Sequence, residues 1–189
     1  PLYPGTRGMT GGRLIAVVGP SGVGKDSVMA GMIAARPDMR LVRRTITRTP
    51  GLGGEDYTAV TQDAFDAAAQ KRAFCVYWSA HGLSYGIPAD VLTDVKGGKD
   101  CLANFSRSAL IQARSLSPDL IVLNIPASPA TLAHRLAGRG RETEAEIAAR
   151  LAQADKALPS GLNVVTVTND GALENTVTQA LAALQPVRA

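Results

Sequence analysis

The chain has 189 residues, of which 46% are hydrophobic and 19% charged, values typical of a globular protein with one core-forming domain. Its net charge of +4 is mild, and no basic block with interleaved aromatic residues occurs, so we expect no nucleic-acid binding. No apolar run is as long as a membrane span, no signal-peptide pattern occurs, and the two cysteines form neither a disulfide framework nor a metal-ligand spacing, so we expect a cytoplasmic protein without membrane association.

The first predicted elements are a strand, a glycine-rich loop and a helix. Residues 14–18 form an apolar, β-branched run suited to a buried parallel strand, and residues 28–35 have the pattern of a helix that ends before Pro37. Glycines in the loop between them allow backbone N–H groups to converge on a phosphate, and the helix N-terminus adds partial positive charge. We therefore predict an ATP-binding P-loop made of Gly19, Pro20, Ser21, Gly22, Val23, Gly24, Lys25, Asp26 and Ser27.

The end of this loop departs from the usual pattern. A P-loop lysine reaches the β- and γ-phosphates, as Lys25 is expected to do, and is followed by a serine or threonine whose hydroxyl binds Mg²⁺. Here Asp26 follows the lysine, and Ser27 comes next. Asp26 could bind the metal through its carboxylate, or Ser27 could take that role. Alternatively, Asp26 only favours the first turn of the helix.

The next part of the chain is expected to form a small β-rich insert. Its short alternating apolar runs are separated by glycine and proline clusters, which is typical of strands joined by turns. The predicted elements are a strand at 41–47, a glycine-rich loop at 48–57, a helix at 62–71 capped by Thr61, and strands at 74–80 and 83–85 joined by His81-Gly82.

Strands and helices then alternate to the end of the chain. This alternation predicts an α/β fold with a parallel sheet and helices on both faces. The predicted elements are a helix at 89–95 opened by Pro88, a strand at 101–105, a helix at 106–114, a buried strand at 120–125, a helix at 128–136, a helix that begins with the capping box Thr143-x-x-Glu146, a strand at 163–167 and a helix at 172–184.

Two arginines near the predicted helix break are candidates for transition-state stabilisation. Arg139 lies in the glycine-bracketed segment 138–141 between two helices, as a mobile lid would require. Arg150 falls at the edge of the apolar stripe of the next helix and could reach a cleft from there. A planar guanidinium suits phosphoryl transfer, but Arg150 could equally cover apolar surface with its aliphatic stem.

Taken together, the order of motifs resembles the guanylate-kinase-like branch of the nucleoside monophosphate kinases over residues 13–184. The matching motifs are residues 19–27, Thr47-Arg48-Thr49-Pro50 leading to Asp56-Tyr57, Gly82-x-x-Tyr85-Gly86, and Arg139-Gly140-x-Glu142 followed by Arg150. The resemblance implies a P-loop core, a helical lid and a β-rich insert that binds the phosphate acceptor. It also implies that Arg48, Tyr57 and Tyr85 contact an acceptor phosphate, and that Lys25, Arg139 and Arg150 are the catalytic residues.

The departures from that family concern the base of the acceptor. Where guanylate kinases have polar side chains that contact guanine, this chain has Val76, Ile87 and Asn104, and Gly51 replaces a second arginine. A site that lacks those polar groups has no reason to select guanine. Instead, Lys25-Asp26-Ser27, Gly53-Gly54-Glu55-Asp56 and Asn104-x-Ser106-Arg107 resemble the ribose 1,5-bisphosphate phosphokinases, a group within this family.

That second resemblance implies a substrate and a reaction. The enzyme would use ATP and Mg²⁺ to convert ribose 1,5-bisphosphate, a small sugar bisphosphate, into 5-phosphoribosyl 1-diphosphate in bacteria that use phosphonates. Asp56, Asn104 and Arg107 would join the substrate-binding residues. Two alternatives stay open: a nucleoside monophosphate kinase with altered base preference, and a non-catalytic interaction module. The sequence does not indicate an oligomeric state.

The expected domain organisation follows from these motifs. Residues 1–11 would be a leader outside the fold, and residues 12–184 would form one kinase domain. Within that domain we expect a core at 12–47 and 98–184, an acceptor-binding insert at about 48–88, and a lid at about 137–150.

Overall fold

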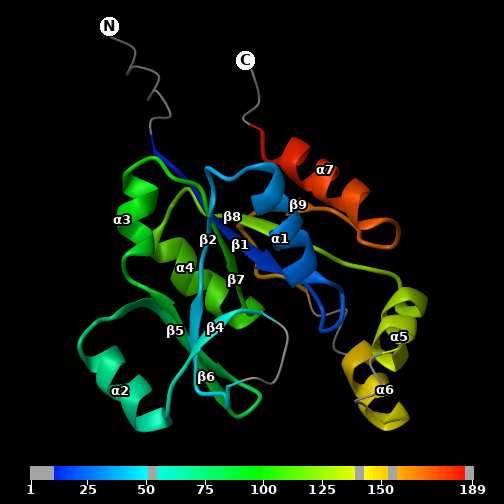
Figure 1. The fold of residues 1–189 in the computed structure, drawn as a ribbon, viewed down its shortest axis with the longest axis horizontal. Helices are drawn as coiled ribbons and strands as arrows, with labels where there is room; N and C mark the ends of the chain where they lie inside the picture. The colour runs from blue at the N-terminus through cyan, green and yellow to red at the C-terminus, as the bar shows by residue number, and fades with distance from the viewer. Residues whose placement is uncertain (1–10, 51–54, 139–142, 153–156, 186–189) are drawn as a thin grey trace, which may run out of the picture.

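A five-stranded sheet forms the centre of the protein in a computed structural model that describes residues 11–50, 55–138, 143–152 and 157–185 (Figure 1). All its strand pairs are parallel. In spatial order the strands are β2 (Arg40–Leu41), β7 (Cys101–Asn104), β1 (Leu14–Val18), β8 (Ile121–Asn124) and β9 (Asn163–Thr166).

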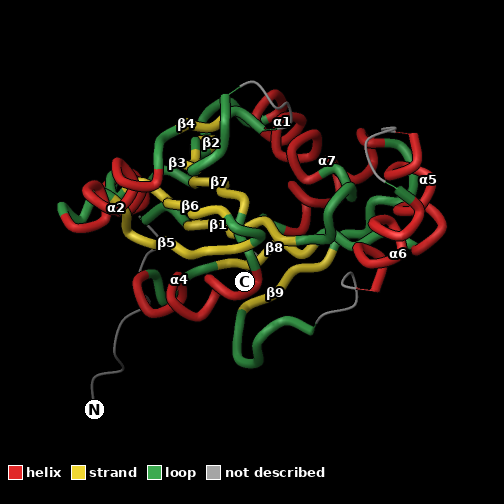
Figure 2. The backbone as a smooth tube through the Cα atoms, turned by 90° about the horizontal axis from the view of Figure 1, so that it is seen from below, coloured by secondary structure: helices red, strands yellow, loops and turns green. Residues whose placement is uncertain are grey.

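Helices cover both faces of this sheet, as Figure 2 shows. Helices α1 (Lys25–Ala35) and α7 (Leu173–Ala183) pack on one face, and α3 (Val91–Lys96) and α4 (Leu110–Leu116) pack on the other. Because side chains alternate along a strand, β1 supplies both cores. Leu14, Ala16 and Val18 join the α3–α4 core, whereas Ile15 and Val17 join the α1–α7 core, and all five are fully buried. The predicted α/β architecture is confirmed.

A second, mixed sheet of four strands forms the insert. Its order is β4 (Tyr57–Ala59), β3 (Arg44–Ile46), β6 (Leu83–Pro88) and β5 (Phe74–Ala80), with α2 (Gln62–Gln70) beside it. The Thr61 hydroxyl accepts a hydrogen bond from the Ala64 N–H at 3.2 Å, so the predicted cap of α2 is present. His81 and Gly82 both have positive φ at the tip of the β5–β6 hairpin, where the sequence predicted the turn.

Three predicted elements differ in detail. The strand expected at 41–47 is two strands, because the chain leaves the core sheet after β2 and enters the insert sheet at β3. The insert sheet therefore begins within the 12–47 range assigned to the core. Pro88 ends β6 rather than opening a helix, since a residue without an N–H is tolerated in either place. The helix expected at 106–114 begins as a 3₁₀ turn, η1 (Arg107–Ala109), before α4.

Helices α5 (Pro129–Gly138) and α6 (Glu144–Ala152) lie across the molecule from the insert (Figure 1). The region predicted as a lid, at about 137–150, includes most of α6 but only the last two residues of α5, and residues 139–142, including Arg139, lie outside the described residues. Residues 1–10 of the expected leader also lie outside them. Among the described helices, none is long and apolar enough to cross a bilayer.

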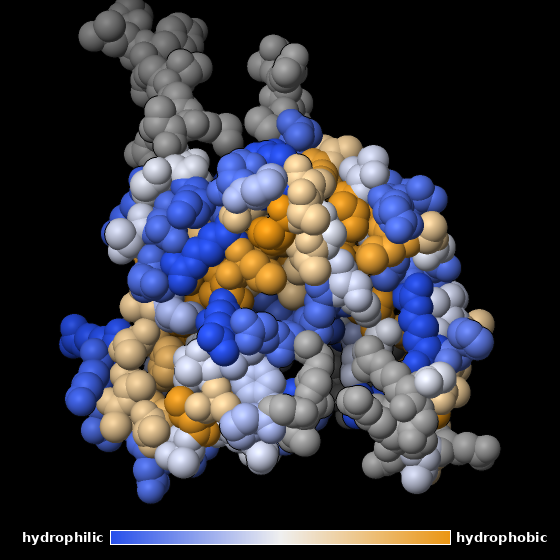
Figure 3. Space-filling model, in the orientation of Figure 1, coloured by the Kyte–Doolittle hydropathy of each residue, from blue (hydrophilic) through white to orange (hydrophobic). Residues whose placement is uncertain are grey.

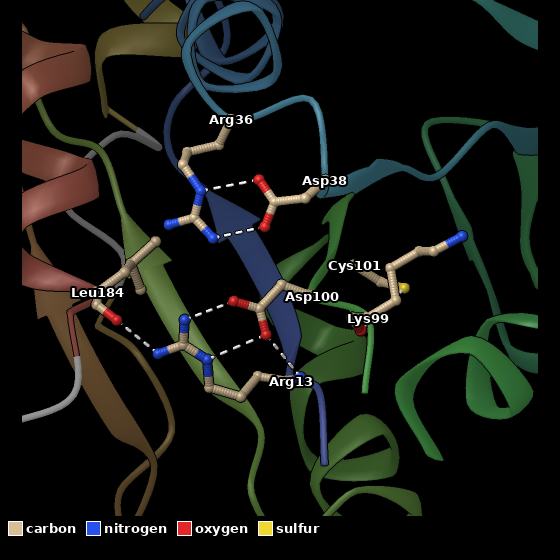
Figure 4. A network of polar contacts seen from close by, with 7 residues as sticks. All are labelled: Arg13, Arg36, Asp38, Lys99, Asp100, Cys101 and Leu184. Carbon is tan, nitrogen blue, oxygen red and sulfur yellow. Dashed lines mark hydrogen bonds and ion pairs between the residues drawn. The ribbon is translucent and has the colours of Figure 1, made fainter. Parts of the chain in front are cut away.

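A polar clamp fixes the edge of the core sheet at which the parallel strands begin (Figure 4). The Arg13 guanidinium donates to both carboxylate oxygens of Asp100 and to the carbonyl oxygen of Leu184. These contacts tie the starts of β1 and β7 to the end of α7. The P-loop follows β1 and therefore lies at the opposite edge of the sheet.

Candidate active site

The loop after β1 has the backbone geometry of a phosphate cradle. Gly24 begins α1 in the left-handed region, with φ of 96°, where a side chain would be strained. A Cβ atom at Gly19 would lie 2.3 Å from the carbonyl oxygen of Ile125, so only glycine fits there. The loop thus stays close to the sheet and leads into the N-terminus of an eleven-residue helix.

Polar side chains distant in sequence hold this loop through hydrogen bonds. The Asn169 amide donates to the carbonyl oxygen of Val23 at 2.8 Å, and the Arg135 guanidinium donates to the same oxygen at 2.9 Å. The Thr176 hydroxyl in turn donates to the Asn169 side-chain oxygen at 2.8 Å. Asn169 and Thr176 are 4% and 2% exposed, so these bonds are shielded from water. These supporting residues were not among the predicted site residues.

Lys25 lies across the loop that precedes it. Its ammonium donates to the carbonyl oxygens of Gly19 at 2.9 Å and Pro20 at 3.2 Å. Burial is the main cause that lowers the pKa of Lys25 to about 8; the Arg44 charge lowers it further, and the Asp26 carboxylate opposes both. The ammonium therefore stays mostly charged at pH 7 and can bind a phosphate oxygen.

Asp26 and Ser27 are exposed in the first turn of α1, directly after the P-loop lysine. Although Asp26 is partly exposed, the surrounding protein removes water from its carboxyl group, and this desolvation, followed by the nearby Glu55 carboxylate, raises the pKa of Asp26. The Asn104 amide lies between the two acids, 3.4 Å from an Asp26 oxygen and 2.9 Å from a Glu55 oxygen. Asn104 ends β7, so it reaches the P-loop from the core sheet.

Two of the predicted arginines, Arg150 and Arg107, also lie at this edge of the core sheet. The Arg150 guanidinium on α6 donates to the Ser21 hydroxyl of the P-loop, which places it beside the cradle rather than on a distant surface. Arg107 is half-buried at the start of η1, directly after β7, and its charge contributes to the lowered pKa of Lys25. Arg139 lies outside the described residues.

The predicted acceptor residues Arg48, Asp56 and Tyr57 lie together at the start of the insert. The Arg48 guanidinium lies over the Tyr57 ring, 5.6 Å from its centre, and the Tyr57 hydroxyl donates to the Thr49 carbonyl oxygen at 2.7 Å. Asp56 is exposed and pairs with Arg43 at 3.1 Å. In the described part of the chain, none of these three side chains is joined to the P-loop by a hydrogen bond or an ion pair.

Tyr85 takes part in a stack of aromatic rings that links the two sheets. It is 7% exposed and stacks on Trp78, with ring centres 5.5 Å apart, and Trp78 stacks in turn on Phe105 of the core at 5.6 Å. Val76 and Ile87, the positions where polar base contacts are missing, are fully buried in the α3–α4 core. Neither provides a hydrogen-bonding side chain.

One buried ion pair connects the insert to the P-loop and was missed from the sequence. Both oxygens of Glu55 accept from Arg44, at 2.7 Å from Nε and 2.6 Å from Nη2. The alternation of Val42, Arg44 and Ile46 places a charged residue on a buried face, and all three are buried. That alternation was a signal available in the sequence.

The site therefore lies at the carboxyl ends of β1 and β7, with the insert on one side and α5–α6 on the other. In Figure 3, drawn in the orientation of Figure 1, hydrophilic residues lie near the centre of this face, between the insert and α5–α6. The described residues that converge on the cradle are Lys25, Asp26, Asn104, Arg107 and Arg150. Such an arrangement of one lysine, two arginines and oxygen ligands can bind and polarise a transferring phosphoryl group.

Comparison with known proteins assigns the chain to a family. The guanylate kinase family profile matches residues 11–186. The chain belongs to the guanylate kinase family. This assignment confirms the predicted family, and the kinase activity of the family agrees with the P-loop geometry.

Proteins with similar sequences include three that are named ribose 1,5-bisphosphate phosphokinase PhnN. The protein from Ruegeria sp. strain TM1040 is 49% identical over 94% of this chain and 94% of its own length. The protein from Rhizobium etli is 42% identical over 96% of this chain and 93% of its own, and the one from Agrobacterium fabrum is 43% identical over 86% and 90%. The fold is similar to that of the guanylate kinase from Anaplasma phagocytophilum, with a TM-score of 0.66 and 15% identity over 94% of this chain and 87% of that one.

Proposed function

We propose that this protein is an ATP-dependent ribose 1,5-bisphosphate phosphokinase. The observation that carries the proposal is the 49% identity, over nearly the full length of both chains, to a protein of that name. The buried, apolar Val76 and Ile87 support it, because an acceptor without a base needs no polar contacts at those positions. These positions disfavour the alternative of a guanine nucleotide acceptor.

The reaction would be an in-line transfer between phosphates. An oxygen of the 1-phosphate attacks the γ-phosphorus of ATP, the bond from that phosphorus to the β–γ bridging oxygen breaks, and ADP leaves with that electron pair. The products are ADP and 5-phosphoribosyl 1-diphosphate. Because the attacking phosphate is already ionised, no general base is needed, so the chain's task is to position two anions and neutralise their charge.

Three residues would neutralise charge during the transfer. Lys25 would move its ammonium from the loop carbonyls to the β- and γ-phosphate oxygens. Arg150 would extend from Ser21 to the transferring group, and Arg139, in the proposed lid at about 137–150, would approach from the other side. A lid that closes only with both substrates present would exclude water and prevent ATP hydrolysis.

The residues at the cradle fit Mg²⁺ together with ATP. Among the described residues, no cluster of three or more acidic, histidine or cysteine side chains could hold a metal by itself. Mg²⁺ usually binds through one or two protein oxygens, with phosphate oxygens and waters completing its shell, so Asp26 and Ser27 would suffice as its protein ligands. When bound, the ion would neutralise charge between the β- and γ-phosphates.

The insert, at about 48–88 together with β3, would bind the acceptor. Arg48 and Tyr57 would contact a phosphate group, with Asp56 beside them. Tyr85 would present its hydroxyl at the end of the aromatic stack. Asn104 and Arg107 would contact the acceptor from the core side. The cytoplasmic location and the absence of nucleic-acid and membrane partners, expected from the sequence, stay predictions.

An acceptor panel tests the proposal. Purified protein with ATP and Mg²⁺ is offered ribose 1,5-bisphosphate, ribose 5-phosphate or GMP, and ADP release is followed. We expect rapid ADP release with ribose 1,5-bisphosphate alone. ADP release with GMP alone would indicate a nucleoside monophosphate kinase. ATP binding without transfer to any acceptor would indicate a non-catalytic module.

A further inference from the structure

We propose that Arg44 binds the acceptor phosphate that attacks ATP, and that Glu55 is the residue that positions it. The inference rests on the proposed function and adds a specificity-determining residue to it. Arg44 and Glu55 are the only ion pair among the described residues in which both side chains are less than 15% exposed. A buried charge pair seldom adds stability over an apolar pair, so its presence calls for a functional reason.

The hydrogen bonds of Arg44 leave one edge of its guanidinium available. Glu55 accepts from Nε and Nη2, which together form the side edge of the group. Within the described part of the chain, Nη1 has no hydrogen-bond acceptor, although the side chain is only 10% exposed. The end edge, Nη1 with the second hydrogen of Nη2, therefore keeps the fork geometry that binds a phosphate through two oxygens.

The guanidinium is fixed in place by the insert sheet. The strand register places Ile46 beside Tyr85, so Arg44, two residues earlier, shares that face of the sheet. The guanidinium carbon lies 4.9 Å from the centre of the Tyr85 ring and 5.8 Å from that of Trp78. These cation–π contacts and the carboxylate of Glu55 hold the group in one orientation, which lowers the entropy cost of binding an anion.

The position of the pair relative to the P-loop identifies which phosphate it would bind. Glu55 accepts from the Asn104 amide, and the same amide lies 3.4 Å from Asp26, the residue after the P-loop lysine. Two side chains, those of Glu55 and Asn104, therefore connect Arg44 to Asp26 through hydrogen bonds. The attacking phosphate of the acceptor must lie next to the γ-phosphate of ATP, on this side of the insert.

The test compares two ligands that differ only in the attacking phosphate. Trp78 is the single tryptophan of the chain and lies beside Arg44, so its fluorescence reports acceptor binding directly. With the ATP site filled by a non-hydrolysable ATP analogue, the protein is titrated with ribose 1,5-bisphosphate and with ribose 5-phosphate. We expect R44M to lose about 10- to 100-fold in affinity for the bisphosphate, the value of charge-assisted hydrogen bonds, and to change less than about 2-fold for ribose 5-phosphate.

Two further variants separate binding from support of the fold. R44K keeps the charge but loses the fork, so it should show an intermediate loss for the bisphosphate, and it serves as the test if R44M does not fold. E55Q replaces one acceptor oxygen by an amide, so Arg44 is no longer held; the bisphosphate should again lose affinity selectively, by less than in R44M. The matched controls are R36M and D38N, because Arg36 and Asp38 form the same two-bond pair on the exposed surface (Figure 4). Both controls should bind the two ligands as wild type does.

The outcomes separate the two proposals. If wild type neither binds nor phosphorylates ribose 1,5-bisphosphate, the proposed function is wrong, and the role of Arg44 falls with it. If wild type uses the bisphosphate but R44M and R44K lose equal affinity for both ligands, or lose none, the function stands and the role of Arg44 is overturned. An equal loss would mean that the ion pair only supports the fold.

Discussion

Asn169 offers a direct test of how the P-loop is held, because its side chain joins the loop to α7. In N169A, the Val23 carbonyl oxygen keeps its bond from Arg135, so the lost bond costs about 0.5–1.5 kcal/mol. The Thr176 hydroxyl, 2% exposed, is left without its acceptor, which costs about 1–3 kcal/mol. The free energy of unfolding should therefore fall by about 1.5–4.5 kcal/mol, equivalent to a drop in Tm of roughly 3–18 °C.

The N169A substitution should also weaken ATP binding. The Asn169 amide nitrogen would lie 3.1 Å from a Cβ at Gly24, so the amide packs directly against the left-handed residue that starts α1. If about 1.4 kcal/mol of the lost energy served to hold the loop, the Kd for ATP should rise about 10-fold. Urea unfolding gives the first quantity and calorimetric titration the second. T176V is the matched control: it removes only the hydrogen bond from Thr176 to the Asn169 oxygen, so it should cost about 1–3 kcal/mol with ATP affinity unchanged. A destabilisation below about 0.5 kcal/mol in N169A, or equal ATP affinity in N169A and wild type, would refute this account of the loop.

Three more predictions follow from the site. R150A should lower kcat about 10²–10³-fold in a steady-state assay, because a guanidinium at the transferring group is lost; near-normal turnover would contradict its role. ATP affinity should fall as the pH rises from 7 to 9, because Lys25 loses its charge through a pKa of about 8, and K25M should show no such dependence. In the absence of ATP, the stability of the fold depends on pH in the opposite direction. Between pH values of about 8 and 10.5, the pKa of Lys25 in the folded protein and its ordinary value, the folded state binds fewer protons than the unfolded state, so the contribution of Lys25 to stability rises with pH. V76E should destabilise the fold by at least about 3 kcal/mol without conferring GMP turnover, since Val76 is fully buried and a single carboxylate does not restore the other missing base contacts; a stable variant that phosphorylates GMP would contradict this expectation.

The P-loop and the core could be predicted because local sequence specifies them. Five apolar residues before Gly19 require a strand buried on both faces, and β1 supplies side chains to both cores. The Thr61 cap and the His81-Gly82 turn are likewise local signals, and both are present. The division between β2 and β3 was not predicted, because a continuous run of strand-forming residues carries no mark of a change from one sheet to another.

The parts of the site that were missed depend on contacts distant in sequence. Asn169 lies 146 residues after Val23, and no spacing rule connects them. Glu55 entered the sequence prediction only as part of the motif Gly53-Gly54-Glu55-Asp56, yet it is the partner of Arg44 and the neighbour of Asn104. Asn104 itself was predicted from the resemblance, and the structure places it next to Asp26. The pairwise geometry of charged groups becomes visible only once the two sheets are in place.

The measurement that tests the central claim most directly is the fate of the γ-phosphoryl group. ATP labelled with ¹⁸O in its γ-phosphate is incubated with the protein, Mg²⁺ and ribose 1,5-bisphosphate, and the product is analysed by ³¹P NMR and mass spectrometry. The account predicts 5-phosphoribosyl 1-diphosphate with the label in its terminal phosphoryl group, and no transfer when GMP replaces the sugar bisphosphate. Labelled inorganic phosphate with the sugar bisphosphate unchanged, or labelled GDP in the GMP reaction, would contradict it.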